Sequence, residues 1–501
     1  MPKIPQEIIS PELEGLKLVH RGKVRDTYEI PDTYLMLVVA TDRISIFDHV
    51  LHTLVPQKGQ ILTAMNIFWR QFFTGVFADD LMAFGPEIDR YLPKRLQENP
   101  ELQARATVVR RLEMYPLEAI VRGFLTGSEL ESYTQSHRIC GHRLPTQLQD
   151  GDDLPYLLFT PTTKAEIGHD EHITADSVSQ TWGVQIERTV IQLFSMMQMY
   201  AASRGMVLAD TKFELGRDKD QAIVFGDEIG TPDSSRYWDL ETWRESRMHE
   251  KRRSPASFDK QLVREWGRAI GIKERNPMSD ADVAWVQAQR VPAEVIADAT
   301  NAYLYAFFRL TGMKLARFQK DRIRIDVKLP NVKIDVIAGS ESDLKEMAEG
   351  LNLLSQASRL GHAEVRRHII SCHRNPEELA AYVRALPLDR VLIAGAGKAA
   401  ALPGMLKALL THEGKSRIPV IGVAFAGQNS DPDAGLAAQL SIEHLPDRSV
   451  LLGPNNKAYF GSKGFYEACK AALEHEFYSV KPKDPKPAQL NLQLIPFDPH
   501  G

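Results

Sequence analysis

The sequence predicts two fold classes in one chain: a first region that mixes strands and helices, and then an α/β domain with a doubly wound parallel sheet. The chain has 501 residues, which at about 150 residues per domain corresponds to roughly three domains or two large ones. From Asn331 onward, short apolar runs alternate with helical segments, and this β-α-β-α order is typical of a parallel sheet. Up to about Gly312, short apolar runs are instead separated by loops rich in charged residues.

The composition narrows the class of function. Lys and Arg number 61 against 65 Asp and Glu, so the net charge is −4, which argues against a protein that mainly binds nucleic acid or an anionic membrane. The longest apolar runs are far shorter than the ~18 residues of a membrane span, and the first residues lack the apolar core of a signal peptide. Cys140, Cys372 and Cys469 are scattered and form neither a disulfide framework nor a zinc pattern. We therefore expect a soluble, cytoplasmic protein.

The first domain is expected to span residues 1–312. Strands are predicted at Leu35–Ala40 and Ile223–Phe225, which are short, apolar and β-branched. Helices are predicted at Gln180–Ser203, where apolar residues recur at helical spacing, and at Ala293–Leu310, which follows a proline.

The second domain is expected to span residues 333–478. It begins with a strand at Lys333–Ala338, followed by a helix from Ser342, a candidate N-cap, to about Leu360. The alternation continues with strands at Val365–Ile370, Arg390–Ile393 and Ile418–Val423 and helices at Pro376–Leu386 and Leu402–Leu410. Residues 313–332, rich in Lys and Arg, are expected to be a linker, and residues 479–501 an extended C-terminal tail.

Two segments of the first domain place polar residues beside predicted strands. Gly22-Lys23-Val24-Arg25-Asp26 sets a glycine beside two cations, which suits a nucleotide phosphate, and a solvated turn is the alternative. Thr41–Asp48 follows an apolar strand, and either a functional site or a salt-bridged turn accounts for its polar residues.

A third segment indicates a cation site. Strand alternation places Asp210, Lys212 and Glu214 on one face, and the return strand Ile223–Phe225 ends close to Asp227. Carboxylates crowded around one lysine repel each other unless a cation lies among them, and such hard oxygen ligands suit Mg²⁺ bound with nucleotide phosphates. The alternative is a charged hairpin that faces solvent.

Two neighbouring loops carry further polar groups. Thr160–Glu166 has hydroxyls and one lysine, which suit a polar ligand. His169-Asp170-Glu171-His172 contains two histidines, but without the i, i+4 spacing of a helical zinc site. A surface turn or a substrate-site loop is therefore the better interpretation of this tetrapeptide.

These motifs belong to an ordered set that resembles the SAICAR synthetase (phosphoribosylaminoimidazole-succinocarboxamide synthase) family from the start of the chain to about Gly312. The resemblance implies an α+β ATP-binding fold and an ATP-dependent ligase of de novo purine (IMP) biosynthesis. ATP would phosphorylate the carboxylate of carboxyaminoimidazole ribotide (CAIR), and the amine of L-aspartate would displace that phosphate. Further matching segments are Pro116–Ser128, Asp227-Glu228, Pro232–Arg236 and Ser257–Gln261, and Leu215 stands where the family usually has Phe.

The resemblance also implies roles for individual residues, which fall into four sets by ligand. The sets are Gly22, Lys23 and Arg25 for the ATP phosphates, Glu214 and Asp227 for Mg²⁺, Arg122, Ser128 and Arg236 for the ribotide phosphate, and Lys212, Asp210 and Asp48 near the reacting groups. Arginine suits the ribotide phosphate because its planar fork binds phosphate at two points.

The second domain contains five further motifs, which are Gly339–Asp343, Ser371–Pro376, Gly395–Gly397, Leu402–Met405 and Pro419–Val423. Through these motifs it resembles the class I carboxyaminoimidazole ribonucleotide mutase/carboxylase family, which has a Rossmann-like, flavodoxin-like fold and makes CAIR. All matching motifs lie at strand–helix junctions, where phosphorylated ligands bind. The ribotide site that the resemblance implies consists of Ser340, Ser342, Asp343, His373, Arg374, Gly395 and Gly397, with His373 handling protons. Two positions depart from the family: Lys398 replaces a glycine, and Ala401 replaces a histidine. We therefore expect this domain to be catalytically impaired or structural.

Two alternatives remain open beside a ligase with an impaired second domain. One is a bifunctional enzyme whose second domain makes CAIR from the aminoimidazole ribotide or its N5-carboxylated form. The other is a kinase-like nucleotide-binding protein with a different acceptor, which would require the ordered motifs to be coincidence. Since the second family is usually octameric, we expect a homo-oligomer through the C-terminal domain. The expected ligands are ATP, CAIR and L-aspartate, with Mg²⁺ as the cofactor. We do not expect the protein to bind nucleic acid or a membrane.

Overall fold

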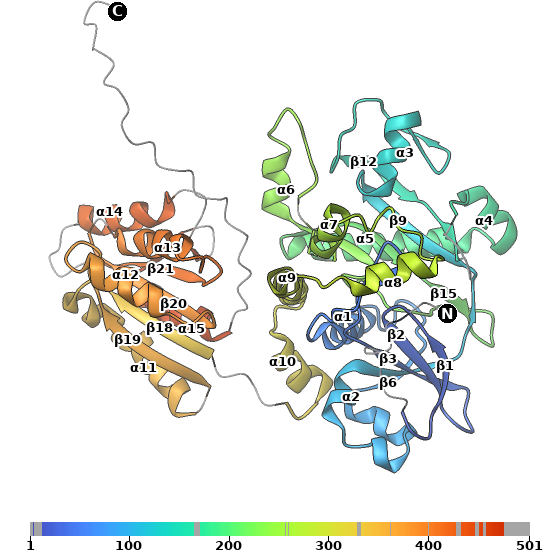
Figure 1. Cartoon of the computed structure of the whole chain (residues 1–501), viewed down its shortest axis with the longest axis horizontal. Helices are drawn as coiled ribbons and strands as arrows, with labels where there is room; N and C mark the ends of the chain where they lie inside the picture. Colours follow the sequence, from blue (N-terminus) through green and yellow to red (C-terminus); the bar gives the residue numbers. More distant parts are fainter. Residues whose placement is uncertain are drawn as a thin grey trace, which may run out of the picture. The chain divides into compact units, whose positions relative to one another are not determined.

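The computed structural model divides the chain into two compact units, unit 1 (Met1–Lys328) and unit 2 (Leu329–Gly501). Figure 1 shows the helices and strands of each unit. The structure describes residues 4, 13–164, 171–255, 257–258, 260–327, 332–360, 362–398, 400–426, 432–445, 450–453 and 457–474. The predicted tail at residues 479–501 lies outside these ranges. No helix in the described ranges is long and apolar enough to cross a membrane.

Unit 1 begins with a five-stranded antiparallel sheet in the order β1-β2-β3-β7-β6. Its strands are β1 (Lys17–Arg21), β2 (Arg25–Glu29), β3 (Leu35–Ala40), β6 (Leu81–Phe84) and β7 (Ala106–Arg110). Helix α1 (Lys58–Phe72) contacts the central strand β3. The prediction of a strand at Leu35–Ala40 is therefore confirmed.

A second antiparallel sheet in unit 1 has the strand order β12-β9-β14-β17. Its strands are β9 (Leu117–Phe124), β12 (Asp153–Phe159), β14 (Met206–Phe213) and β17 (Ser235–Asp239), and β13 (Thr162–Thr163) also pairs with β9. The register places Asp210 opposite Arg122 of β9 on one side and opposite Arg236 of β17 on the other. This register brings together charged residues that are far apart in the sequence.

Three smaller β structures complete unit 1. β15 (Leu215–Arg217) pairs with β16 (Ile223–Phe225) and with β8 (Glu113–Met114), which confirms the predicted return strand at Ile223–Phe225. The other two are short hairpins, formed by β4 (Ser45–Ile46) with β5 (His49–Val50) and by β10 (Arg138–Ile139) with β11 (His142–Arg143).

The helices of unit 1 confirm one prediction and correct another. Ala293–Leu310 was expected to be helical, and α9 spans Ala293–Thr311. The single helix expected at Gln180–Ser203 is wrong, because Gly183, at φ +94°, separates α4 (Ala175–Trp182) from α5 (Gln185–Ser203). The remaining helical segments are α2 (Pro100–Arg105), α3 (Ser128–Ser136), α6 (Leu240–Ser246), α7 (Gln261–Ala269), α8 (Asp280–Ala288), η2 (Gly85–Tyr91) and η3 (Lys94–Leu96).

Part of the expected linker is packed into unit 1. Residues 315–323 form α10 (Leu315–Phe318) and the π-helical turn η4 (Gln319–Ile323). Phe318 and Ile323 are buried, and Gln319 Nε2 donates a hydrogen bond to Gln60 Oε1 at 3.0 Å. The apolar residues in this basic segment therefore anchor it, and the two units divide at Lys328.

Unit 2 contains a parallel sheet in the order β19-β18-β20-β21-β22, which is the 2-1-3-4-5 order of flavodoxin-like folds. Its strands are β18 (Val332–Ala338), β19 (Ala363–Ile369), β20 (Arg390–Ala396), β21 (Val420–Ala424) and β22 (Tyr459–Phe460). The prediction of a doubly wound parallel sheet is confirmed.

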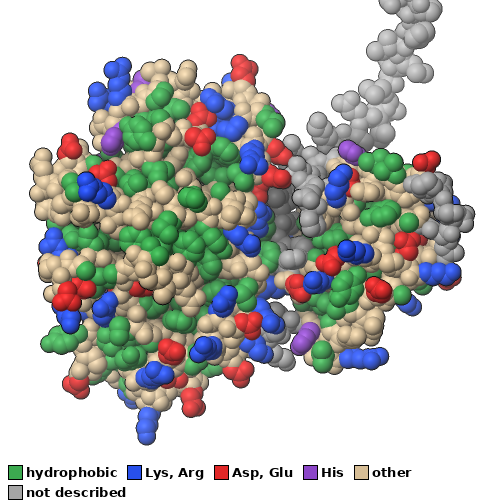
Figure 2. All heavy atoms as spheres, turned by 180° about the vertical axis from the view of Figure 1, so that it is seen from behind, with side chains coloured by type: hydrophobic (Ala, Val, Ile, Leu, Met, Phe, Trp, Pro, Cys, Tyr) green, Lys and Arg blue, Asp and Glu red, His purple; other side chains and the backbone are tan. Residues whose placement is uncertain are grey.

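Helices cover both faces of this sheet, and each face has its own apolar core (Figure 1). One core includes α11 (Leu344–Arg359) and α15 (Gly461–Glu474); the other includes α12 (Pro376–Ala385), α13 (Leu402–His412) and α14 (Pro432–Glu443). The predicted N-cap Ser342 is wrong: it lies within the 3₁₀ turn η5 (Glu341–Asp343), and its backbone N–H donates to the Ser340 side chain at 3.4 Å. On the face seen in Figure 2, cationic and anionic side chains are interspersed, in line with the net charge of −4.

Candidate functional site

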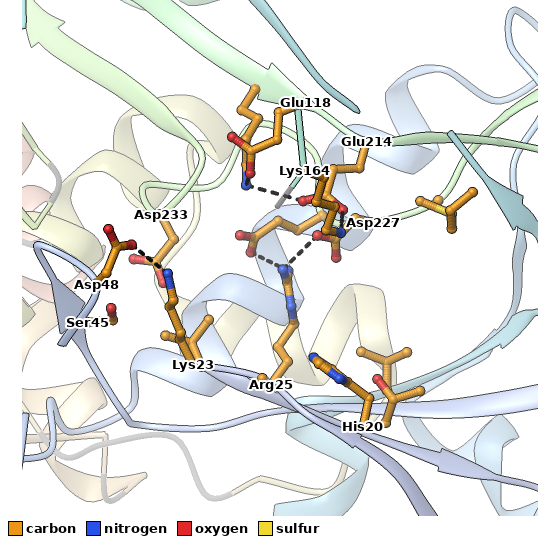
Figure 3. Close-up of a pocket in the computed structure, with 18 of the residues that line it drawn as sticks. His20, Lys23, Arg25, Ser45, Asp48, Glu118, Lys164, Glu214, Asp227 and Asp233 are labelled. Atoms are coloured by element: carbon orange, nitrogen blue, oxygen red, sulfur yellow. Dashed lines mark hydrogen bonds and ion pairs between the residues drawn. The ribbon is translucent and has the colours of Figure 1, made fainter. Parts of the chain in front are cut away.

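A cavity of about 1170 Å³ in unit 1 is lined by residues of both antiparallel sheets and of the loops between them. Seven predicted site residues lie in this lining: Gly22, Lys23, Arg25, Asp48, Lys212, Glu214 and Asp227. Figure 3 shows that the labelled side chains of Lys23, Arg25, Asp48, Glu214 and Asp227 come from separate strands and loops and point into the same cavity. The fold therefore gathers residues that are up to about 200 positions apart into one charged cavity.

Arg25 on β2 joins two neighbouring carboxylates at the end of the β15–β16 hairpin. Its guanidinium contacts Asp227 Oδ2 at 2.7 Å and Glu228 Oε2 at 2.9 Å. Burial raises the pKa of Asp227; Arg25 opposes this rise, and Glu214 adds to it. Burial raises the pKa of Glu228 as well. One guanidinium therefore leaves these carboxylates incompletely compensated, and a further cation among them would be stabilised.

Glu214 is held by two lysines on the opposite side of the same cluster. Lys212 Nζ lies 3.2 Å from Glu214 Oε1 and 2.6 Å from Glu118 Oε1, and Lys164 also pairs with Glu214. Burial acts to raise the pKa of Glu214, but Lys212 and Lys164 outweigh it and lower the pKa to about 2. Burial likewise lowers the pKa of Lys212, but its two carboxylate partners outweigh this and raise the pKa above the ordinary value. Lys212 is therefore a permanent cation, suited to stabilising negative charge rather than to acting as a base.

Asp48 reaches the cavity from a strained turn. Only Phe47 and Asp48 separate β4 from β5, and both have positive φ, +47° and +65°, as in a type I′ hairpin turn. Such a conformation costs on the order of 1 kcal/mol for each non-glycine residue, and this kind of strain is concentrated at functional sites. Asp48 Oδ1 accepts a hydrogen bond from Lys23 Nζ at 2.6 Å. The turn thus holds a carboxylate beside the lysine expected to bind ATP.

A second cluster contains the residues expected to bind the ribotide phosphate. Arg122 Nη1 donates to Asp210 Oδ2 at 2.8 Å, and Arg236 donates to the same oxygen. Arg122 Nε also donates to Thr160 Oγ1 at 3.0 Å. Ser128 begins α3. Asp210, which is expected near the reacting groups, lies between the two arginines and is not among the residues that line the cavity.

Strands β9 and β14 each contribute residues to both clusters. Asp210 and Lys212 are two residues apart on β14, so they share a face and lie ~7 Å apart along the strand. Glu118 and Arg122 share a face of β9 in the same way. A substrate with a phosphate at one end and a carboxylate at the other could therefore contact both clusters. The same alternation predicts Glu118, which the sequence analysis did not assign to the site.

Other lining residues could not be found from local sequence patterns. His20 on β1 has a pKa lowered by burial and by Lys164. Asp233 pairs with Lys58, which is fully buried, and accepts a hydrogen bond from Tyr303 Oη at 2.7 Å. Burial acts to raise the pKa of Asp233, but Lys58 outweighs it and lowers the pKa to about 2. Lys58 and Tyr303 belong to distant helices, so only the fold reveals this network.

In unit 2, the predicted residues gather at the carboxyl ends of adjacent strands. Gly339 N donates to Gly395 O at 3.0 Å, which joins the ends of β18 and β20. Arg374 Nη2 donates to Gly339 O at 3.1 Å. In the turn that follows β18, Ser342 Oγ donates to Ser340 Oγ at 3.0 Å.

Three further residues complete this edge. Burial raises the pKa of Asp343 to about 6. His373 Nδ1 lies 3.6 Å from Cys372 Sγ, and Gly397 precedes Lys398 in the turn after β20. Carboxyl ends of parallel strands are the usual binding edge of such a sheet.

Lys398 keeps a backbone conformation that favours glycine. Its φ is +54°, in the left-handed region, and its side chain is exposed. Ala401 lies at the N-cap of α13 and has no side-chain cap bond. Both departures from the family pattern therefore lie in the short segment that leads from β20 into α13.

Comparisons with known proteins agree with both resemblances. Residues 18–278 match the family described as SAICAR synthetase, and residues 333–451 match the family described as AIR carboxylase. The phosphoribosylaminoimidazole-succinocarboxamide synthase of Thioalkalivibrio sulfidiphilus is 37% identical over 312 residues, covering 61% of this chain and 99% of that protein. That of Pasteurella multocida is 40% identical over 302 residues, covering 59% and 98%. A solved SAICAR synthase from Saccharomyces cerevisiae, complexed with SAICAR, has a TM-score of 0.53 and 34% identity, covering 61% of this chain and 99% of that one.

Proposed function

Because the chain belongs to the SAICAR synthetase family, we propose that unit 1 joins L-aspartate to the carboxylate of CAIR, with ATP as co-substrate, to give SAICAR, ADP and phosphate. The observation that carries the proposal is that two charged clusters lie along the β9–β14 pair. One is a cavity with opposed lysines and carboxylates, and the other is formed by Arg122 of β9 and Arg236 of β17 on either side of Asp210 of β14. The reaction belongs to purine biosynthesis.

The chemistry requires an activated carboxylate, because a free carboxylate is a poor electrophile. The CAIR carboxylate oxygen attacks the γ-phosphorus of ATP, so that an acyl phosphate forms and ADP leaves. The aspartate amine then attacks the acyl carbon; the C–N bond forms, the bond to phosphate breaks, and the amine loses a proton. Phosphoryl transfer depends on positioning and charge compensation, and Lys23, Arg25 and Lys212 supply cations for it.

Glu214 and Asp227 fit a magnesium ion. Both offer hard carboxylate oxygens to the cavity, and Asp227 shares its guanidinium partner, Arg25, with the neighbouring Glu228. When bound, Mg²⁺ neutralises charge on the ATP phosphates. Gly22, Lys23 and Arg25 bind the same phosphates from the side of β2.

Arg122, Arg236 and Ser128 bind the ribotide phosphate. The contacts of Asp210 with both guanidiniums support this role, because they fix the two forks in place before the substrate arrives. Asp210 is then a positioning residue for the arginines, whereas Lys212 and Asp48 lie near the reacting groups.

Product analysis tests the proposal. The full chain is incubated with ATP, Mg²⁺, CAIR and L-aspartate, and the products are separated by chromatography and identified by mass. We expect equal amounts of ADP and SAICAR, and no SAICAR when aspartate is omitted. If ADP and phosphate form at an unchanged rate without CAIR or aspartate, the enzyme hydrolyses ATP independently of these substrates, and this result would contradict the ligase proposal.

For unit 2 we expect a ribotide-binding domain with little or no turnover. The match to AIR carboxylase and the cluster around Gly339 and Arg374 support binding, whereas Lys398 and Ala401 disfavour catalysis. The alternative is a bifunctional enzyme, which is distinguished by measuring CAIR formation from the ribotide. A rate near the ~10 s⁻¹ typical of enzymes would establish the bifunctional alternative.

Assembly and location complete the proposal. Unit 2 forms a homo-oligomer, which is supported by exposed Leu436 and Leu440 on one face of α14 near Phe460. Light scattering on the full chain measures the number of copies. The three free cysteines support a cytoplasmic location, because disulfides are rare in that compartment.

A further inference from the structure

Glu129, Cys140 and His172 meet beside the arginine cluster, although they come from three separate elements. Glu129 lies on α3, Cys140 in the turn between β10 and β11, and His172 in a segment that pairs with Thr162 of β13. Cys140 Sγ lies 3.5 Å from His172 Nδ1, and His172 Nε2 lies 3.4 Å from Glu129 Oε1. One ligand atom from each of the three side chains can be chosen so that all lie within 4.8 Å of one another.

This set has the composition and spacing of a zinc site. A thiolate, an imidazole and a carboxylate are the ligands that zinc prefers in proteins. Zn–S bonds of ~2.3 Å and Zn–N bonds of ~2.0 Å at a tetrahedral angle place sulfur and nitrogen about 3.5 Å apart. This is the separation between Cys140 Sγ and His172 Nδ1. We propose that Glu129, Cys140 and His172 bind a Zn²⁺ ion, with the fourth position open to water.

The surroundings of Glu129 support a cation at this place. Glu129 is only 1% exposed, yet its contacts with Arg122 and His172 measure 3.5 and 3.4 Å. Charge-assisted hydrogen bonds are shorter, ~2.8 Å, so neither partner fully compensates this buried carboxylate. A zinc ion in the gap between Glu129, Cys140 and His172 would do so.

The backbone at Cys140 is also held in an uncommon conformation. Cys140 and Gly141 form the two-residue turn between β10 and β11, and Cys140 has a φ of +45°. Asn or Gly fills the first position of such a turn at lower cost. The fold thus keeps the thiol beside His172 despite a local penalty.

Local sequence spacing could not reveal this site. Zinc motifs are recognised by ligands a few residues apart, whereas Cys140 and His172 are 32 positions apart in the sequence. The tetrapeptide His169–His172 was interpreted as a turn or a substrate-site loop, and only its last histidine joins the cluster. His169 and Asp170 lie outside the described residues, and the zinc site requires neither.

Zinc binding has a consequence for the ligase, which rests on the proposed role of Arg122. Zinc binds the thiolate form of cysteine, so the metal displaces one proton from Cys140 when it binds. The zinc ion brings two positive charges to the site and the released proton removes one, so the local charge rises by about one unit. Since Glu129 contacts Arg122, this change favours the ribotide phosphate, and zinc lowers the KM for CAIR.

The test uses Co²⁺ as a spectroscopic probe for zinc. The metal-free full chain is titrated with Co²⁺ in the presence of excess Mg²⁺, and the sulfur-to-cobalt charge-transfer absorption is recorded. We expect one thiolate-bound Co²⁺ per chain, displaced by one equivalent of Zn²⁺. Because Mg²⁺ occupies the carboxylates of the ligase cavity and these offer no sulfur, the absorption reports the proposed site even if the ligase assignment fails.

Three variants locate the signal. Cys140→Ser abolishes the absorption, and His172→Asn, a change in a half-exposed side chain that leaves the core intact, weakens Co²⁺ binding at least about tenfold. Cys372→Ser is the matched control, since Cys372 Sγ also lies close to a histidine, at 3.6 Å, and it leaves the absorption unchanged. The proposal is overturned if no absorption develops, or if it survives Cys140→Ser. An unchanged KM for CAIR in the zinc-loaded enzyme contradicts the coupling to Arg122.

Discussion

Replacing Asp227 by Asn isolates the charge of the proposed magnesium site. Asn keeps nearly the same size and removes one negative charge from the cavity. Arg25 retains its second partner, because Glu228 contacts it at 2.9 Å. Burial raises the pKa of Asp227, so its charged form is held in an unfavourable environment when no metal is present. We therefore expect the metal-free Asp227→Asn enzyme to fold and to be at least as stable as the parent at pH 7.

The main effect of Asp227→Asn should be weaker binding of magnesium. An interaction with a charged group contributes ~1.5–3 kcal/mol, and each 1.4 kcal/mol corresponds to a factor of ten, so the half-saturating Mg²⁺ concentration should rise roughly 10- to 100-fold. Turnover at ordinary Mg²⁺ should fall by a similar factor. The parent should gain thermal stability when Mg²⁺ and ATP are added, and the variant should gain much less.

Two measurements and one matched variant make this prediction decisive. ADP formation is measured against Mg²⁺ concentration, and thermal unfolding is measured with and without Mg²⁺ and ATP. Glu228→Gln removes the other carboxylate from the same guanidinium, and we expect its Mg²⁺ dependence to stay close to that of the parent. An Asp227→Asn enzyme with normal rate and normal Mg²⁺ dependence would refute the metal assignment. Equal effects of both substitutions would show that the loss of a carboxylate partner of Arg25, and not the loss of a metal ligand, causes the change.

Three other predictions follow from the same contacts. Arg236→Lys should raise the KM for CAIR by about tenfold and leave the KM for ATP nearly unchanged, since Lys cannot reproduce the two-point contact of the guanidinium with phosphate. Steady-state kinetics with each substrate varied in turn measures both constants. A change confined to the KM for ATP would mean that Arg236 binds ATP and not the ribotide. Asp233, with its pKa lowered to about 2 by Lys58, stabilises the fold fully above ~pH 4 and loses this contribution as the pH falls through about 2. Urea unfolding of Asp233→Asn should therefore show a loss of ~3–5 kcal/mol at pH 7 that shrinks in acid, and a constant loss would contradict the pairing. Lys398→Gly should raise the stability of unit 2 by up to about 1 kcal/mol, measured by calorimetry, because glycine adopts a left-handed backbone without strain. A less stable variant would show that the backbone at Lys398 carries no strain. The double variant Lys398→Gly with Ala401→His should increase any CAIR formation from the ribotide.

Period and spacing in the sequence were enough to predict the parallel sheet of unit 2, because its first four strands and first three helices carry local signals, whereas β22, α14 and α15 were not predicted. The predicted bounds of β18 and β21 lie within two residues of the observed ones, and β20 extends three residues beyond its predicted end. The error at Gln180–Ser203 has a local cause, since the apolar spacing continues across Gly183 while the backbone there turns to positive φ. Packing explains the linker, where Phe318 and Ile323 are buried against unit 1 despite the surrounding charges.

Charged site residues were predictable where they share a strand and unpredictable where distant elements meet. Alternation along β14 correctly placed Lys212 with Glu214, but the position of Asp210 between two arginines depends on strand register, which no local pattern encodes. The pairing of Lys58 with Asp233, and of Cys140 with His172, depends on tertiary contacts in the same way.

Transfer of heavy oxygen from the CAIR carboxylate tests the central claim most directly. CAIR labelled with heavy oxygen in its carboxylate is turned over by the full chain with ATP, Mg²⁺ and L-aspartate, and the inorganic phosphate is examined by mass spectrometry. If an acyl phosphate forms and aspartate displaces it, one carboxylate oxygen leaves with the phosphate, so each phosphate carries one heavy oxygen and the remaining label stays in SAICAR. Unlabelled phosphate, released in step with ADP, would contradict activation of the carboxylate and with it the proposed ligase mechanism.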